Sequence, residues 1–311
     1  MIEIKHLRLV QALASAGSLS GAARQLGYSQ PAVTQQLQKL EAELNTPLLT
    51  RTTTGVHLTS AGEVLLRHGA SVLSSVSLAR AEVDAVAGLR AGQVRVTSFA
   101  SAAATLLPGA FAAVSQAHPG LSFTLVEALP EESLDILRNG ECDLAVVYHY
   151  ASGSSNDEPA PLAFTDEVST ELLEENVYVA LPRSHPASAK ARVTLNDLAD
   201  DHWIAGCPSC RGNLVNSCEV AGFSPDIAFE TDDYVALQRL VAAGLGVAMV
   251  TDIMLAAARP DSDLVLRRLS PAPVRTVRVV SSQSLLRVPG VRQTIDALSA
   301  AAGGLDLVTV D

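Results

Sequence analysis

The chain of 311 residues is 48% hydrophobic and 18% charged, which is enough to bury the cores of two or three domains. No run of about eighteen uncharged apolar residues occurs, and charges interrupt the apolar residues at the N-terminus. These features argue against a membrane-spanning helix and a signal peptide, so we expect a cytoplasmic protein. The net charge of −11 is uneven: residues 1–90 hold 8 Lys and Arg against 6 Asp and Glu, whereas residues 91–311 hold 14 against 27. Only the N-terminal part therefore suits a polyanionic partner.

Residues 18–44 predict two helices joined by a tight turn. Ser18 can cap a helix over residues 19–26, and Gly27 can end it in the left-handed conformation. The second helix opens at Ser29 with Pro31 in its first turn, where no backbone N–H is needed. One face of it is apolar, through Val33, Leu37, Leu40 and Leu44. The opposite face carries Gln30, Thr34, Gln35 and Gln38.

Amides and hydroxyls on an exposed helix face complement the donors and acceptors of base edges in the DNA major groove. The alternative is a solvated helix of any small bundle. The following residues 47–59 predict a short β-wing with Gly55 at its tip, whose Arg and Thr side chains can contact phosphates. The candidate DNA-binding residues are Ser29, Gln30, Pro31, Thr34, Gln35, Gln38, Arg51 and Thr53.

Residues 60–90 predict one long helix, opened by a capping box over residues 60–63. Apolar residues repeat every seven positions, and small or apolar residues lie four positions behind them. The two sets are Leu65, Val72, Ala79 and Val86, and Gly69, Val76 and Val83. Such a repeat is typical of a helix–helix seam, so we expect dimerisation through this helix. The alternative is a helix that lies on its own domain.

From residue 94 onward, apolar strand-like runs alternate with amphipathic helices, which predicts a parallel, doubly wound α/β sheet in two lobes. Residues 151–161 read as a surface loop and residues 303–311 as a loose tail. Ligands of open α/β sheets bind beyond the carboxyl ends of the strands. The candidate effector-binding residues there are Thr97, Ser98, Ser101, Tyr148, Cys207, Cys210, Arg211, Thr231 and Asp232. Each hydroxyl among them can equally be a helix cap.

The four cysteines divide into two kinds. Cys142 lies in an apolar strand and is expected in the core. Cys207 and Cys210 form a C-x-x-C pair at a predicted helix start, with Cys218 eight residues further on. This setting favours a lowered thiol pKa, and hence redox or metal chemistry, although a cysteine-lined small-molecule pocket is the preferred interpretation. If Cys210 and Cys218 share one helix, they are about 12 Å apart, too far for a disulfide without unwinding.

Residues 1–62 resemble the winged helix-turn-helix of the LysR-type transcriptional regulators, and the similarity extends over nearly the whole chain. It rests on the runs AARQLGYSQPAVTQQLQKLEAELNTPLLTR and GVHLTSAG. The resemblance implies that Gln30, Pro31, Thr34, Gln35 and Arg51 approach DNA. Many members have Arg where this chain has Gln35, which removes a possible bidentate guanine contact.

The resemblance also implies an effector domain similar to periplasmic binding proteins. Ser98, Ser101 and Thr231 resemble positions that contact inducers in family members. The cysteine segment is similar to the redox segment of the peroxide-sensing members, but Cys210 lies one residue away from the matching position. LysR-type proteins usually assemble into tetramers on bent DNA.

We therefore expect three segments: a winged helix-turn-helix over 1–59, a linker helix for dimerisation over 60–91, and a two-lobed effector domain over 92–311. Lobe I comprises about 92–162 and 269–303, and lobe II about 163–268. The expected function is transcriptional regulation by a homodimer or homotetramer that binds a pseudo-palindromic operator in double-stranded DNA. A small-molecule effector between the lobes would modulate that binding.

The alternatives are a peroxide-type redox regulator using Cys207, Cys210 and Cys218 and, more remotely, a solute-binding protein without DNA function. No G-x-S-x-G, H-E-x-x-H or phosphate-loop pattern occurs, so we expect neither an enzyme nor catalytic residues. We also expect no cofactor, no bound metal and no membrane partner.

Overall fold

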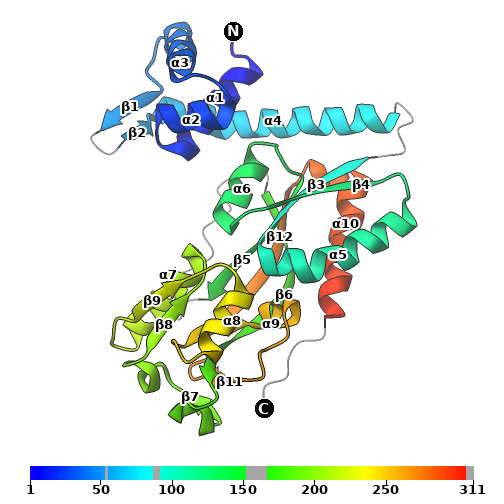
Figure 1. The fold of residues 1–311 in the computed structure, drawn as a ribbon. Helices are drawn as coiled ribbons and strands as arrows, with labels where there is room; N and C mark the ends of the chain where they lie inside the picture. Colours follow the sequence, from blue (N-terminus) through cyan, green and yellow to red (C-terminus); the bar gives the residue numbers. More distant parts are fainter. Residues whose placement is uncertain (53–54, 87–91, 152–166, 306–311) are drawn as a thin grey trace.

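The computed structural model describes residues 1–52, 55–86, 92–151 and 167–305. The N-terminal part is a compact group of helices beside a two-stranded wing, followed by one long helix (Figure 1). Its elements are α1 (Ile4–Ala16), α2 (Leu19–Leu26), α3 (Gln30–Leu44), β1 (Leu49–Thr52), β2 (Gly55–Leu58) and α4 (Ser60–Val86).

Local signals set the helix ends in the helix-turn-helix. The Ser18 hydroxyl accepts a hydrogen bond from the Gly21 N–H at 3.1 Å, and Gly27 ends α2 at φ 69°. On α3, Val33 and Leu40 are fully buried in one core with Leu9 of α1. The predicted apolar face of α3 is therefore the face that packs, and the polar face is left outside.

The start of α4 differs from the prediction by one residue. Thr59, not Ser60, is the capping residue: its Oγ1 accepts from the Gly62 N–H at 3.1 Å and donates to the Pro47 carbonyl at 2.7 Å. The carbonyl of Thr59 accepts the Glu63 N–H at 2.9 Å. Thr59 therefore joins the wing to the long helix, which Ser60 cannot do from inside the first turn.

The long helix α4 presents two different faces. Gly69 and Leu73 are buried on the face towards the N-terminal core, and a Cβ at Gly69 would lie 3.3 Å from Leu7 of α1. Val72, Val76 and Val83 are exposed by 45%, 39% and 65%. The predicted repeat therefore splits: Gly69 packs within its own domain, while the three valines remain available to a partner.

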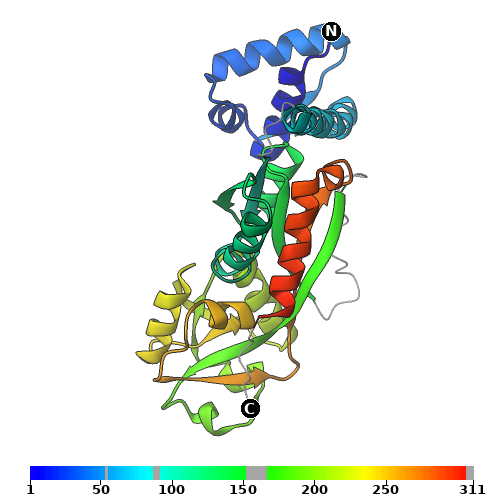
Figure 2. The same cartoon turned by 90° about the vertical axis from the view of Figure 1, so that its right-hand side faces the viewer.

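The remainder of the chain is a two-lobed α/β domain that lies beneath the N-terminal part in both views, with lobe I next to it (Figures 1 and 2). The elements of lobe I are β3 (Gln93–Ser98), α5 (Ala100–Ala117), β4 (Ser122–Glu127), α6 (Pro130–Arg138), β5 (Leu144–Ala151), β12 (Val274–Ser282), the 3₁₀ turn Leu285–Arg287 and α10 (Pro289–Gly303). Those of lobe II are the 3₁₀ turns Pro186–Ala189 and Leu195–Leu198, β7 (Arg192–Val193), β8 (His202–Ala205), α7 (Pro208–Val220), β9 (Asp226–Glu230), α8 (Tyr234–Ala242), β10 (Ala248–Thr251), α9 (Asp252–Ala257) and β11 (Leu264–Leu269). The strand β6 (Glu167–Pro182) runs from one lobe into the other.

The main sheet has the order β4-β3-β5-β12-β6-β11-β7, with β10 paired to β6. Strands β3, β4 and β5 are parallel, as predicted, whereas β12 and β6 are antiparallel to their neighbours. The sheet is thus mixed, because the chain crosses between the lobes on β6 and returns on β12. The first half of β6 pairs with β12 and the second half with β11 and β10. One strand therefore fixes the two lobes to each other.

A hydrogen bond joins the N-terminal and effector parts. The Gln11 side chain of α1, which is 4% exposed, donates through Nε2 to the Arg138 carbonyl at the end of α6, at 3.0 Å. Lobe I is thereby joined to the helix-turn-helix by a polar contact in addition to the covalent connection.

Candidate functional site

The polar face of α3 is free to meet a ligand. Gln30, Pro31, Gln35 and Gln38 are exposed. Thr34 is half-buried and donates its hydroxyl to the Gln30 carbonyl at 3.0 Å, which holds that side chain along the helix. These residues lie together on the outer surface of the helix-turn-helix.

The flanks of this face complete the candidate DNA-binding set. Ser29 is the exposed N-cap of α3, and its side chain makes no capping hydrogen bond, so the first N–H groups of the helix remain available for phosphate. Arg51 lies on β1 opposite Val56 of β2. Thr53 lies outside the described residues.

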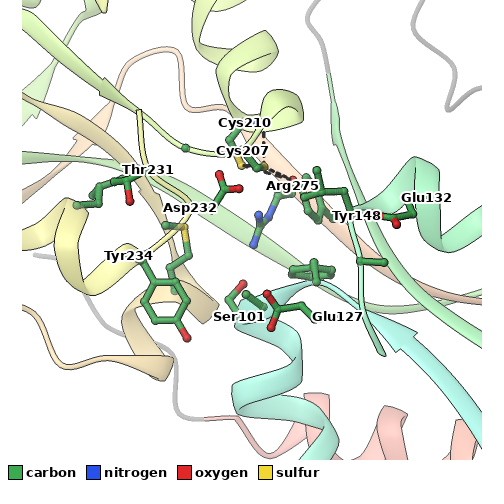
Figure 3. Close-up of a pocket in the computed structure, with 17 residues that line it drawn as sticks. Ser101, Glu127, Glu132, Tyr148, Cys207, Cys210, Thr231, Asp232, Tyr234 and Arg275 are labelled. Carbon is green, nitrogen blue, oxygen red and sulfur yellow. Dashed lines mark hydrogen bonds between the residues drawn. The ribbon is translucent and has the colours of Figure 1, made fainter. Parts of the chain in front are cut away.

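A cavity of about 220 Å³ lies between the two lobes (Figure 3). A protein cavity of about 150 Å³ can hold benzene, so this one has room for a small metabolite. Six of the nine predicted effector residues line it, namely Ser101, Tyr148, Cys207, Cys210, Thr231 and Asp232. Its other lining residues are Phe99, Ala100, Glu127, Ala128, Leu129, Glu132, Gly206, Tyr234, Leu237, Met254 and Arg275.

The other three predicted residues do not reach this cavity. Thr97 is 1% exposed, and its hydroxyl lies 3.6 Å from the Sγ of Cys142. Ser98 is fully buried and donates to the Phe99 carbonyl. Both stand on β3, which continues through Ser98, so their side chains are held within the packed sheet. Arg211 lies on the outer side of α7 and pairs with Glu230 at 2.9 Å.

Arg275 is the central residue that sequence reasoning missed. Its guanidinium is 2% exposed and pairs through Nε with the fully buried Glu175, and its Nη2 donates to Thr251 at 2.9 Å. It also lies 4.3 Å from the centroid of the Tyr148 ring, a cation–π contact. The second oxygen of Glu175 accepts the Ile253 N–H at 2.9 Å. This ion pair joins β12, β6 and the start of α9, and its arginine forms part of the cavity wall.

Apart from Arg275 and the cysteine and tyrosine side chains, the ionisable side chains that line the cavity are acidic. Glu127, Glu132 and Asp232 face it without a hydrogen bond or ion pair to any residue in the described part of the chain. The Ser101 side chain, whose residue is 5% exposed, likewise points into the cavity with its hydroxyl unpartnered among those residues. Since Arg275 is neutralised by Glu175, the lining as a whole carries negative charge.

The C-x-x-C pair stands at the start of α7, on the lobe II wall of the cavity. The Cys207 thiol lies 2.9 Å from the Sγ of Cys210, and the Tyr148 hydroxyl contacts both sulfurs from lobe I. Cys218 lies in the lobe II core, fully buried, two turns along the same continuous helix. A Cys210–Cys218 pair would therefore require α7 to unwind, as the helical spacing predicted.

Comparisons with known proteins agree with this architecture. Residues 4–63 match the family described as bacterial regulatory helix-turn-helix protein, lysR family, and residues 87–303 match the LysR substrate binding domain. The chain belongs to the LysR family of transcriptional regulators.

Two curated relatives illustrate the similarity to other LysR-type regulators. The transcriptional dual regulator GltC of Bacillus subtilis is 27% identical over 285 residues, which cover 91% of this chain and 92% of GltC. The small neutral protease regulatory protein of Streptomyces lividans is 32% identical over 304 residues, 96% of this chain and 81% of that protein.

Solved structures share the fold. A full-length OxyR variant from Pseudomonas aeruginosa matches with a TM-score of 0.60 at 21% identity, over 100% of this chain and 99% of the other. The LysR family regulator CbnR matches with a TM-score of 0.51 at 23% identity, over 96% and 100% of the two chains. The family match over residues 4–63, a regulatory helix-turn-helix, makes this chain a DNA-binding transcriptional regulator of the LysR type. In the described part of the chain, no helix has the length and apolar character needed to cross a membrane.

Proposed function

We propose that this LysR-type regulator changes its DNA binding in response to a small molecule held in the cavity between lobes I and II. The observation that carries the proposal is the cavity itself, which both lobes line and into which the buried Ser101 hydroxyl points without a partner. A ligand that bonds to both walls stabilises one arrangement of the lobes over others, and this differential affinity is what a switch requires. We propose no catalytic activity.

The charge of the cavity lining indicates the class of effector. Glu127, Glu132 and Asp232 are unpaired among the described residues, and the charge of Arg275 is already balanced by Glu175. A carboxylate ligand would meet three like charges, whereas an amine would find acceptors on both lobes. We therefore expect a small effector that carries an ammonium group or several hydrogen-bond donors.

On DNA, we propose that α3 enters the major groove with Gln30, Thr34, Gln35 and Gln38 towards the bases. The exposed valines of α4 support dimerisation, because a row of apolar side chains on a long helix is best buried against a second copy. A two-fold pair of such domains requires a pseudo-palindromic operator with half-sites about one helical turn, or a multiple of it, apart. A homotetramer would need a further contact through the effector domains.

Calorimetric titration with a panel of small amines, amino acids and carboxylates tests the effector proposal. Glu131 and Glu132 are adjacent exposed residues in the first turn of α6, but only Glu132 lines the cavity. Glu132→Gln should weaken binding of the best amine several-fold, and the matched control Glu131→Gln should leave it unchanged. Binding only of carboxylates, or equal effects of the two substitutions, would refute the proposed site.

A further inference from the structure

Two thiols meet inside the proposed effector cavity. The Sγ atoms of Cys207 and Cys210 are 2.9 Å apart, and both residues line the cavity. A disulfide bond is about 2.05 Å long, so bonding needs a displacement of less than one ångström. Cys207 is the N-cap of α7 and its Sγ accepts the Cys210 N–H at 3.4 Å, so the turn that brings the sulfurs together is part of the helix start.

Two tyrosines from lobe I extend this cluster across the boundary between the lobes. The Tyr148 hydroxyl lies 2.9 Å from the Sγ of Cys207 and 3.4 Å from that of Cys210. The Tyr150 hydroxyl donates to the Sγ of Cys210 at 3.6 Å. Both tyrosines stand on β5, whereas both cysteines stand on lobe II. The oxidation state of the sulfurs therefore affects contacts between the lobes directly.

The hydrogen bonds distinguish the two sulfurs. The S–H of Cys207 points at Cys210 and, together with the Arg275 charge and the two tyrosine hydroxyls, lowers the pKa of Cys210 to about 6 against the opposing effect of burial. Donating that same hydrogen bond raises the pKa of Cys207. Near neutral pH, Cys210 is thus a thiolate nucleophile with a protonated thiol beside it.

We propose that Cys207 and Cys210 form a reversible disulfide when a hydroperoxide enters the cavity. The Cys210 thiolate attacks one peroxide oxygen, the O–O bond breaks, and a sulfenic acid and hydroxide form. The hydroxide takes the Cys207 proton and becomes water. The Cys207 thiolate then attacks the sulfenic sulfur, the S–O bond breaks, and hydroxide leaves to be protonated. With hydrogen peroxide, two thiols and one peroxide give one disulfide and two water molecules, and each sulfur loses one electron.

Disulfide formation would remove the thiolate that accepts from Tyr148 and Tyr150 and the S–H that Cys207 donates. The hydroxyls of buried Tyr148 and half-buried Tyr150 would lose their charged acceptor, which weakens the contact between β5 and α7. The disulfide can form whether or not an effector binds. Only the idea that this change in lobe contacts alters DNA binding rests on the proposed function. Cys142 and Cys218 take no part, since each is buried in a separate core away from the cavity.

Intact-mass measurement and peptide mapping of the full-length protein, before and after one equivalent of hydrogen peroxide, test the proposal. Wild type should lose the mass of two hydrogen atoms, map to a Cys207–Cys210 bridge, and recover with dithiothreitol. Cys207→Ser should instead gain one oxygen, which dimedone traps at Cys210. Cys210→Ser should keep its mass. The control Cys218→Ser should behave as wild type.

Four free thiols in peroxide-treated wild type, or a bridge that includes Cys218, would overturn the proposal. So would a Cys207→Ser protein that forms no trapped sulfenic acid. Calorimetry with the best amine on the reduced and oxidised proteins separates the two ideas. If peroxide forms the Cys207–Cys210 bridge but the protein binds no compound of the panel, the disulfide proposal stands. Only the effector proposal is then refuted.

Discussion

The buried ion pair between β12 and β6 has an exposed counterpart on the same two strands. Arg275 stands opposite Glu175 in the strand register, and Arg278 stands opposite Glu171. The side chains of the first pair are 2% and 0% exposed, and those of the second are 33% and 55% exposed. The same residue types in the same cross-strand geometry therefore differ mainly in burial.

Arg275→Met should destabilise lobe I far more than Arg278→Met. Without Arg275, the Glu175 carboxylate, whose side chain is 0% exposed, keeps only the Ile253 N–H as a donor among the described residues. Removing one partner of a buried pair typically costs about 3–5 kcal/mol, whereas an exposed pair contributes about 0–1 kcal/mol. Most of the difference comes from the uncompensated buried charge rather than from the lost attraction.

Urea unfolding followed by the fluorescence of Trp203, the single tryptophan of the chain, measures both variants. Trp203 is fully buried in lobe II, which β6 joins to lobe I, so its signal reports loss of that connected core. The double variant Arg275→Met with Glu175→Leu should recover most of the stability, because no charge is then left buried. Equal losses for Arg275→Met and Arg278→Met, or a double variant less stable than Arg275→Met, would refute the reasoning.

Three further outcomes are expected. Gln30→Ala should cost specific operator binding about 1–3 kcal/mol per lost base contact while leaving binding to random DNA nearly unchanged, and equal losses on both DNAs would contradict a base-reading role. The double substitution Val76→Asp and Val83→Asp should shift the sedimentation coefficient towards that of a monomer, because it would bury carboxylates in the dimer interface along α4. A double variant that remains a dimer would mean that the interface lies elsewhere. The rate of alkylation of Cys210 should rise as pH passes about 6, where the thiolate forms. Cys207→Ala should move that rise to higher pH, because the thiolate loses its S–H donor. The same pH profile in wild type and Cys207→Ala would show that Cys207 does not lower the pKa of Cys210.

Local signals in the sequence were sufficient where a residue acts on its own neighbours. Ser18 and Gly27 end α2 as predicted, because a hydroxyl cap and a left-handed glycine need only the adjacent turns. The apolar period of α3 likewise predicts its buried face. The N-cap of α4 is Thr59 and not the predicted Ser60, because the Thr59 hydroxyl also donates to the Pro47 carbonyl, just before the wing.

The cavity was predictable only in part, since topology decides which side chains reach it. Arg275 looks like an ordinary outward-facing charge in an alternating strand, and its partner Glu175 lies one hundred positions earlier. Only the antiparallel pairing of β12 with β6 brings them together. Thr97 and Ser98 end a strand as expected for ligand residues, but their hydroxyls turn into the sheet. Ser101, one turn later at the start of α5, is the residue that faces the space between the lobes.

Helix α6 connects the wall of the cavity with the helix-turn-helix. Glu132 in the first turn of this helix lines the cavity, and the carbonyl of Arg138 at its other end holds Gln11 of α1. The six residues between these two positions span about 9 Å of helix. If the proposed effector binds at Glu132 and tilts α6, the Arg138 carbonyl that holds Gln11 would be displaced with the helix, which gives a direct connection from the cavity to α1.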